Sequence, residues 1–185
     1  IYSGVSWHHK IIVIDNRFIS ERVNQIRNWN MEFVHADILD KDIVKKYFRD
    51  ADIVHHLAGL TDVPRTKAES TQEKDKKIRL VGENGTQNIL NVISKKCKII
   101  FPSTHVIYEG IDKIKKDIKE DEESKPVLSY SLSKSINEKQ LKESGKNYII
   151  LRLGSVYGYS TDTARIDIMP NLFSKISSQN GTVKL

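Results

Sequence analysis

The sequence has one cysteine, no long apolar run and no long run of charges of one sign. The single cysteine, Cys97, excludes an internal disulfide and suits a reducing compartment, so we expect a cytoplasmic protein. No run approaches the length of a membrane span and no signal-peptide pattern opens the chain, so we expect no membrane anchor. The densest charge run, residues 112–125, is mixed in sign. It indicates a solvated loop and argues against a nucleic-acid-binding protein.

The spacing of histidine, cysteine and carboxylate residues shows no pattern typical of a metal site. His55 and His56 are adjacent, so on a strand their side chains point to opposite faces of the sheet. A core or surface position is the simpler interpretation of each histidine. We therefore expect no metal centre.

The chain is long enough for one domain, or one and a fraction. Its 185 residues are 38% hydrophobic and 29% charged, and the formal net charge is +6. This composition indicates a globular protein with a lysine-rich surface. Its net positive field would favour an anionic ligand such as a nucleotide.

Short apolar segments alternate with segments of helical periodicity. Helices are expected after the capping residue Asp40, from Thr71 to Lys96, and around Tyr130. Near-continuous apolar strands separated by helices predict an α/β fold with a doubly wound parallel sheet of the Rossmann type. The expected strands are Lys10–Asp15, Met31–Asp37, Ala51–Gly59, Lys98–Thr104 and Asn147–Gly158.

In such a fold, ligands bind beyond the carboxyl ends of the strands, so the residues there are candidate site residues. Asp15, followed by Asn16, could accept hydrogen bonds from both ribose hydroxyls of an adenosine and would repel a 2′-phosphate. Asp37 could face an adenine. In isolation, a helix cap or a turn is the favoured interpretation of either aspartate.

Small or hydroxylic residues end two further strands. Ala58 and Gly59 would let the backbone approach a ligand closely, although an ordinary turn also explains the glycine. Ser103 and Thr104 could hydrogen-bond a substrate oxygen, and a plain strand-terminating pair is the alternative.

Tyr130 and Lys134 have the spacing Y-x-x-x-K, which places both side chains on one face of a helix. An ammonium beside a phenol favours the phenolate and lowers the pKa of the tyrosine. Such a phenol can take a proton from a substrate hydroxyl or return it. Taken alone, the spacing favours two solvated surface residues, because tyrosine and lysine are common on protein surfaces.

Several segments occur in an order that raises the significance of this pair. They are Asp15-Asn16, DIVHHLAGLTDV (52–63), NGTQNIL (84–90), FPSTHVIYEG (101–110), YSLSK (130–134) and LRLGSVYG (151–158). Together they resemble the extended short-chain dehydrogenase/reductase family, specifically its nucleotide-sugar epimerase and dehydratase group. In this resemblance the first segment corresponds to the end of the family's second strand, and the next to its fourth-strand motif.

The resemblance implies a catalytic site of three residues. Tyr130 would be the general acid/base, Lys134 would lower its pKa and hold the nicotinamide ribose, and Thr104 would position the substrate hydroxyl. The implied cofactor is NAD, the implied substrate is a nucleotide sugar, and a homodimer is possible. The residues implied to line the dinucleotide, besides Tyr130 and Lys134, are Asp15, Asn16, Asp37, Ile38, Leu57, Ala58 and Gly59.

The sequence also departs from the family pattern. The glycine fingerprint that holds the pyrophosphate is not found, because Ile1–Trp7 offers only Gly4. We therefore expect a dinucleotide-binding domain over residues 1–166, only the start of a substrate-binding domain over 167–185, and no activity from these residues alone. Ser155 replaces the asparagine that the family usually has directly before V-Y-G. Gly82 falls at the family's helix asparagine, so either Asn84 serves in a shifted register or that contact is lost.

One departure bears on the reaction. The two positions after the catalytic hydroxyl, acidic in the family's 4,6-dehydratases, are His105 and Val106 here. Valine cannot act as a base, so the resemblance favours an epimerase over a dehydratase or decarboxylase. A 4-keto-sugar reductase is the alternative, because STHVIYEG is similar to a reductase segment. A dinucleotide-binding regulator without activity is a third possibility.

Overall fold

The computed structural model describes residues 9–60, 66–158 and 165–183, so the expected position of the glycine fingerprint lies outside the described residues. The chain divides into two compact units, Ile1–Leu151 and Arg152–Leu185. The first unit carries every candidate site residue. The expected domain boundary at residue 166 stays a prediction.

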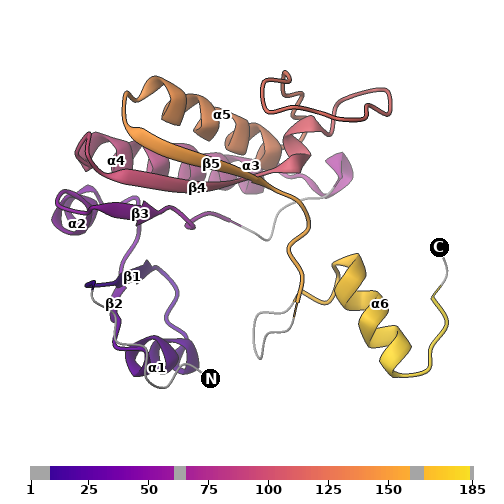
Figure 1. Ribbon diagram of the computed structural model, residues 1–185, viewed down its shortest axis with the longest axis horizontal. Helices are drawn as coiled ribbons and strands as arrows, with labels where there is room; N and C mark the ends of the chain where they lie inside the picture. The colour runs from indigo at the N-terminus through magenta and orange to yellow at the C-terminus, as the bar shows by residue number, and fades with distance from the viewer. Residues whose placement is uncertain (1–8, 61–65, 159–164, 184–185) are drawn as a thin grey trace. The chain divides into compact units, whose positions relative to one another are not determined.

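The strands form two groups (Figure 1). β1 (Ile12–Asp15) pairs in parallel with β2 (Glu32–His35), with Asp15 opposite His35. β3 (Ile53–His55) pairs in parallel with β4 (Lys98–Thr104), which also pairs with β5 (Asn147–Leu153). The usual doubly wound strand order is 3-2-1-4-5-6. If β1 is the second strand of that order, the observed pairings match its 3-2 and 4-5-6 parts, which confirms the predicted fold class.

Helices follow the strands as the alternating pattern predicts. The Asp40 carboxylate caps α2 by accepting from the amides of Asp42 (3.0 Å) and Ile43 (3.1 Å), as expected from the sequence. The expected long helix forms in three consecutive stretches, the middle one a π-helix. The helices are α1 (Ser20–Asn28), α2 (Lys41–Phe48), η1 (Lys67–Glu69), α3 (Gln72–Arg79), η2 (Leu80–Asn84), α4 (Gly85–Val92), η3 (His105–Tyr108), α5 (Ser129–Glu143) and α6 (Met169–Ser178).

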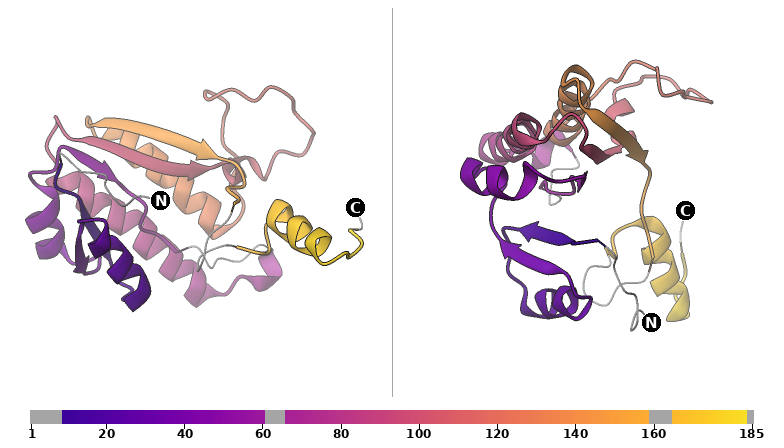
Figure 2. Two further views of the ribbon diagram at one scale, coloured as in Figure 1. Left: turned by 60° about the horizontal axis from the view of Figure 1, so that its bottom comes forward. Right: turned by 60° about the vertical axis from the view of Figure 1, so that its left-hand side comes forward.

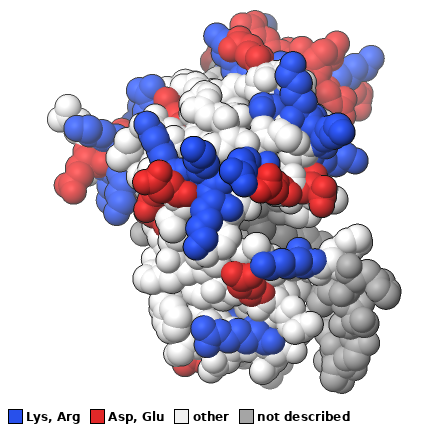
Figure 3. Space-filling view, turned by 90° about the vertical axis from the view of Figure 1, so that its left-hand side faces the viewer, with Lys and Arg blue, Asp and Glu red and all other residues white. Residues whose placement is uncertain are grey.

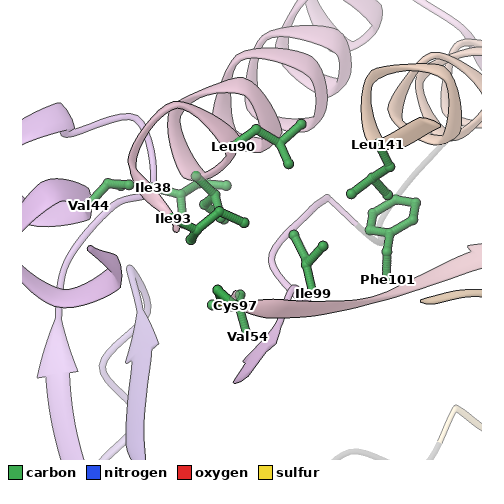
Figure 4. Close-up of a cluster of buried hydrophobic side chains, with 10 residues drawn as sticks. Ile38, Val44, Val54, Leu90, Ile93, Cys97, Ile99, Phe101 and Leu141 are labelled. Carbon is green, nitrogen blue, oxygen red and sulfur yellow. The ribbon is translucent and has the colours of Figure 1, made fainter. Parts of the chain in front are cut away.

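α3, α4 and α5 lie on one face of the β3–β4–β5 sheet (Figures 1 and 2). Apolar side chains from both layers bury one another between the helices and the strands, and Leu141 of α5 lies over Phe101 of β4 (Figure 4). Burial of this apolar area fixes α5 on β4. The core residues are Ile38, Val44, Val54, Ile89, Leu90, Ile93, Cys97, Ile99, Phe101 and Leu141.

Four of the expected strands are shorter in the structure, and the third and the fifth differ most from the expectation. The third strand ends at His55 and not at Gly59, because the chain turns once His56 has donated its amide to the carbonyl of Ile100 (2.9 Å). The amide of Leu57 then bonds the carbonyl of His55 (3.0 Å), which closes a three-residue turn. β5 ends at Leu153, directly before Gly154.

The surface carries charges of both signs. On the face shown in Figure 3, lysine and arginine side chains are interspersed with aspartate and glutamate side chains. Within the part of the chain that the structure describes, no helix has the length and apolar character needed to cross a membrane.

Candidate active site

The predicted catalytic pair lies where α5 meets the carboxyl end of β4. Lys134 donates from Nζ to the carbonyl oxygen of Pro102 (2.8 Å). The same nitrogen lies 4.4 Å from the centre of the Phe101 ring and 5.9 Å from the centre of the Tyr130 ring. Thr104 ends the same strand, and its hydroxyl oxygen accepts from the amide of Val106 (3.3 Å) at the start of η3. The structure therefore brings Tyr130 and Lys134 to the strand end that carries Thr104.

The ammonium of Lys134 is mostly removed from water. Its burial lowers the pKa of Lys134 to about 8, so the side chain is still largely protonated at neutral pH. The Pro102 carbonyl and the face of the Phe101 ring partly replace its hydration, since a cation is attracted to an aromatic face. This environment holds a positive charge beside Tyr130.

His56 is part of the support beneath this cation. It is buried, its Nε2 lies 2.8 Å from the hydroxyl oxygen of Thr86, and its ring centre is 5.5 Å from that of Phe101. Burial, followed by the positive charge of Lys134, lowers the pKa of His56 to about 4, so this imidazole is neutral near pH 7. Each histidine was expected at a core or a surface position, and the structure buries His56 and exposes His55. The bond to Thr86 was not predicted.

The neighbouring hydroxyls at the end of β4 have different roles. Ser103 is buried and donates to Oε1 of Glu138 on α5 (2.6 Å). Glu138 also lies 3.6 Å from Nζ of Lys142. Sequence reasoning noted Ser103 and Thr104 but missed this buried bond, which ties α5 to β4. A polar residue four positions after Lys134 on the same helix face was its only sequence signal.

The π-helix gives α5 a second set of contacts. Asn137 donates to the carbonyl of Gly82 (3.1 Å), and Gln140 donates to that of Glu83 (3.1 Å). A Cβ at Gly82 would lie 2.3 Å from the hydroxyl oxygen of Ser133. α5 thus packs closely against position 82, where any Cβ would displace the Ser133 hydroxyl.

Asn84, the suggested substitute for that asparagine, is exposed. It lines a shallow hollow on the helical surface together with residues of α3 and the start of α5, including Ser129 and Leu132. This hollow is lined by none of the three predicted catalytic residues. The choice between Asn84 in a shifted register and a lost contact therefore stays a prediction.

The predicted adenosine-binding residues meet at the ends of β1 and β2. Asn16 donates from its side chain to Oδ2 of Asp37 (3.0 Å). Asp15 accepts from the amide of Arg17 (2.8 Å), and Asp37 accepts from that of Leu39 (2.9 Å). Asp15 is exposed on the strand end, so its carboxylate has the chemistry and the access that a ribose diol requires. The residues present therefore fit an adenosine, although these contacts also stabilise ordinary turns.

Ile38 differs from the other residues predicted to line the dinucleotide, because its side chain is buried. A Cβ at Gly85 would lie 2.2 Å from its Cδ1, so the side chain packs in the core, and its place in the cofactor lining stays a prediction. Its carbonyl also accepts from Asn88 (3.1 Å). The apolar character of Ile38 itself favours this position.

The predicted segment after β3 remains accessible. Leu57 is 72% exposed, Ala58 is half-buried, and Gly59 is exposed with open space around the position of a Cβ. A ligand could therefore approach this backbone closely. Across the described ranges, no group of three histidine, cysteine or carboxylate residues could hold a metal ion.

The parallel α/β fold and the Tyr–Lys pair at its strand end are the features that the sequence motifs predicted, and comparison with known proteins gives the family. The chain belongs to the NAD-dependent epimerase/dehydratase family, whose model matches residues 4–185. The resemblance inferred from the sequence motifs is thereby confirmed.

Curated relatives name two activities. The chain is 31% identical over 163 residues to a Methanocaldococcus jannaschii protein described as a candidate UDP-glucose 4-epimerase, covering 84% of this chain and 50% of that protein. It is 31% identical over 104 residues to a UDP-N-acetyl-alpha-D-glucosaminuronate decarboxylase of Bacillus cytotoxicus, covering 54% of this chain and 30% of that protein. The chain thus spans half the length, or less, of these relatives.

Solved structures share the fold. The UDP-glucose 4-epimerase of Thermotoga maritima, solved with UDP-glucose, has a TM-score of 0.75 at 24% identity, covering 96% of this chain and 58% of that one. The UDP-glucuronic acid 4-epimerase of Bacillus cereus, solved with NAD, has a TM-score of 0.72 at 22% identity, with the same coverage of 96% and 58%.

Proposed function

We propose that the protein containing this chain is an NAD-dependent nucleotide-sugar epimerase. The observation that carries the proposal is the placement of Lys134, whose ammonium is held by Pro102 and Phe101 beside Tyr130 at the end of β4. Family membership supports a catalytic role for this pair. The name of the archaeal relative supports an epimerase and a UDP-sugar substrate.

In this proposal Tyr130 is the general acid/base. Its phenolate takes the proton of a sugar hydroxyl as that carbon is oxidised, and the phenol returns the proton when the carbon is reduced on its other face. Lys134 favours the phenolate by its positive charge. Thr104 orients the reacting hydroxyl. Bound NAD supplies the acceptor and donor of the hydride.

The chain's own residues for holding NAD are those at the strand ends. Asp15 would bind the adenosine ribose, Asn16 and Asp37 would border the adenine, and the backbone of Leu57, Ala58 and Gly59 would face the dinucleotide. A carboxylate at Asp15 repels a 2′-phosphate, so we propose a preference for NAD over NADP. Lys134 would also hold the nicotinamide ribose.

An epimerase fits the strand end better than a dehydratase does. Val106, at the second position after Thr104, has no group that could remove a proton from the sugar ring. Its amide donates to the hydroxyl oxygen of Thr104. Reversible oxidation at a single carbon needs only the hydroxyl, phenol and ammonium already proposed. A 4-keto-sugar reductase would use the same groups, so cofactor stoichiometry must separate the two.

The test uses the complete natural protein that contains these residues. It is incubated with UDP-hexoses, and the sugar products and the nicotinamide absorbance are followed together. We expect interconversion of epimers without net change of NAD. Stoichiometric oxidation of a reduced cofactor with a keto-sugar nucleotide would establish the reductase, and dinucleotide binding without turnover would establish the regulator.

Tyr130→Phe tests the acid/base assignment. It keeps the ring and its packing but removes the hydroxyl, so turnover should fall by about 10²–10⁴-fold with little change in NAD affinity. Tyr148→Phe on β5, an exposed tyrosine, is the matched control and should retain full turnover. Undiminished turnover in Tyr130→Phe would overturn both the epimerase and the reductase.

A further inference from the structure

A side chain from another part of the chain holds the start of α5. Glu109 directly follows η3, the short helix after β4. Its Oε1 accepts from the backbone amides of Val127 (2.8 Å) and Leu128 (2.7 Å), and the hydroxyl of Ser131 donates to the same oxygen. The carboxylate therefore binds the two residues before α5 and the third residue within it.

The helix start needs such an acceptor. The first amides of a helix have no intrahelical partner, and Leu128, the capping residue, has no side-chain oxygen. In a capping box, a residue three positions on binds the amide of the capping residue. Here the hydroxyl oxygen of Ser131 accepts from the amide of Leu128 (3.2 Å). The carboxylate of Glu109 accepts from the same amide, although Glu109 lies 19 residues before Leu128. Burial alone would raise the pKa of Glu109, but the hydrogen bonds from Ser131, Leu128 and Val127 outweigh it and lower that pKa.

Main-chain bonds join the same two segments. The amide of Gly110 donates to the carbonyl of Lys125 (2.9 Å), and the amide of Lys125 donates to that of Ile107 (2.8 Å). A Cβ at Gly110 would lie 2.6 Å from the Lys125 carbonyl oxygen, so this approach requires glycine. Residues 107–110 and 125–128 thus form a joint that closes the charged loop.

We propose that Glu109 is a positioning residue that sets Tyr130 relative to Thr104. Thr104 precedes the joint on one of its segments, and Tyr130 follows it on the other, directly beside Ser131. The inference rests on the proposed function of Thr104 and Tyr130. A displacement of about 1 Å between reacting groups can cost on the order of 100-fold in rate. A bond that fixes the start of α5 therefore acts on turnover through Tyr130 without touching substrate.

The test compares Glu109→Gln, Glu109→Asp and Glu109→Ala in the complete natural protein. Glutamine keeps an acceptor oxygen at the same reach, so its turnover should stay within about threefold of the unsubstituted protein. Aspartate keeps the charge but is one methylene shorter, and alanine has no acceptor. Both should lower kcat by about 10–100-fold while KM for nucleotide sugar and NAD changes little.

Glu122→Ala is the matched control, because Glu122 belongs to the same charged loop but pairs with Lys115 within it. It should leave kcat unchanged. All assays are run well below the unfolding temperature of each variant, so that every variant is folded. If Glu109 only stabilised the helix and did not position Tyr130, kcat would then be unchanged. If Glu109→Ala does not fold, the comparison of Gln with Asp decides.

Two outcomes would overturn the inference. The first is full turnover in both Glu109→Asp and Glu109→Ala. The second is turnover kept by Glu109→Asp and lost by Glu109→Gln, because the charge of the side chain would then matter and its length would not. Tyr130→Phe is measured in parallel. If Tyr130→Phe is inactive and the Glu109 variants are normal, only this inference fails. If Tyr130→Phe is fully active, the proposed function fails.

Discussion

The ends of β4 and of β1 hold their candidate site residues in different ways. At the end of β4, Lys134 is largely buried and contacts both strand and helix, and His56 and Ser103 below it are buried and hydrogen-bonded across long sequence separations. At the end of β1, Asp15 and Asn16 are exposed, and Asp15 bonds an amide only two residues away.

This difference separates two physical roles. Buried polar groups are costly unless paired, so the contacts at β4 constrain each other and pre-form the catalytic arrangement. Exposed turn residues contribute little to stability, and their carboxylates stay accessible to a ligand. Substitutions at β4 should therefore affect stability and turnover, and those at β1 should affect cofactor affinity with little effect on stability.

The largest expected effect comes from removing the buried cation. Lys134→Met keeps the packed stem but removes the charge that favours the Tyr130 phenolate and holds the ribose. Turnover should fall by at least about 10²-fold, and NAD should bind more weakly. Lys139→Met on the same helix, where the ammonium is exposed and 3.8 Å from Glu143, should change neither. Equal losses in the two variants would contradict the special role of Lys134.

Because His56 is buried in its neutral form, we expect the folded protein to lose stability at acid pH. The pKa of His56 is about 4 in the folded protein and 6.5 as its ordinary value. Between these pH values the unfolded chain binds a proton that the folded protein does not, so stability falls as the pH falls. The loss should reach about 3 kcal/mol by pH 4.

Urea unfolding at pH 7 and near pH 4 measures this loss. His56→Gln can still hydrogen-bond Thr86 and does not titrate, so part of the pH dependence should disappear. His55→Gln, at the exposed neighbouring position, should keep it. The explanation is wrong if both variants show the pH dependence of the unsubstituted protein.

The cofactor side of the comparison is tested at Asp15. Asp15→Ala should weaken NAD binding by about 1.5–3 kcal/mol for each hydrogen bond lost to the charged group. Stability should stay within about 0.5 kcal/mol because the side chain is exposed. Titration of the complete protein with NAD and NADP measures both affinity and preference. Asp50→Ala, another exposed aspartate, is the control, and tighter binding of NADP by the unsubstituted protein would refute the preference.

The smallest expected effect is the difference in stability between two glycine-to-alanine variants. Gly110→Ala would place a Cβ 2.6 Å from the Lys125 carbonyl oxygen, a backbone atom that cannot rotate away. We expect a destabilisation of about 1–3 kcal/mol in urea unfolding. Gly59→Ala, after β3, meets no atom within 4 Å and should stay within about 0.5 kcal/mol. Equal losses of stability at both positions would show that the joint around Gly110 is packed no more tightly than the segment after β3.

Local patterns in the sequence were sufficient for much of the fold. Apolar runs predicted each of the five strands that the described residues form. Asp40 predicted its helix cap, and alternation predicted opposite faces for His55 and His56. The Tyr130–Lys134 spacing predicted that both side chains lie near each other on one helix. Each of these depends on backbone periodicity or on bonds between residues a few positions apart, which the sequence encodes directly.

Only the tertiary structure decided which of several suitable residues face the core. It buried Ile38 and Ser103, left Thr104 at the strand end, joined His56 to Thr86 and brought Glu109 to the start of α5. Three of these contacts, Glu109 with Leu128, His56 with Thr86 and Ser103 with Glu138, join residues 19, 30 and 35 positions apart. Their partners are set by how the helices pack on the strands, and neither side-chain type nor periodicity selects one distant partner among many.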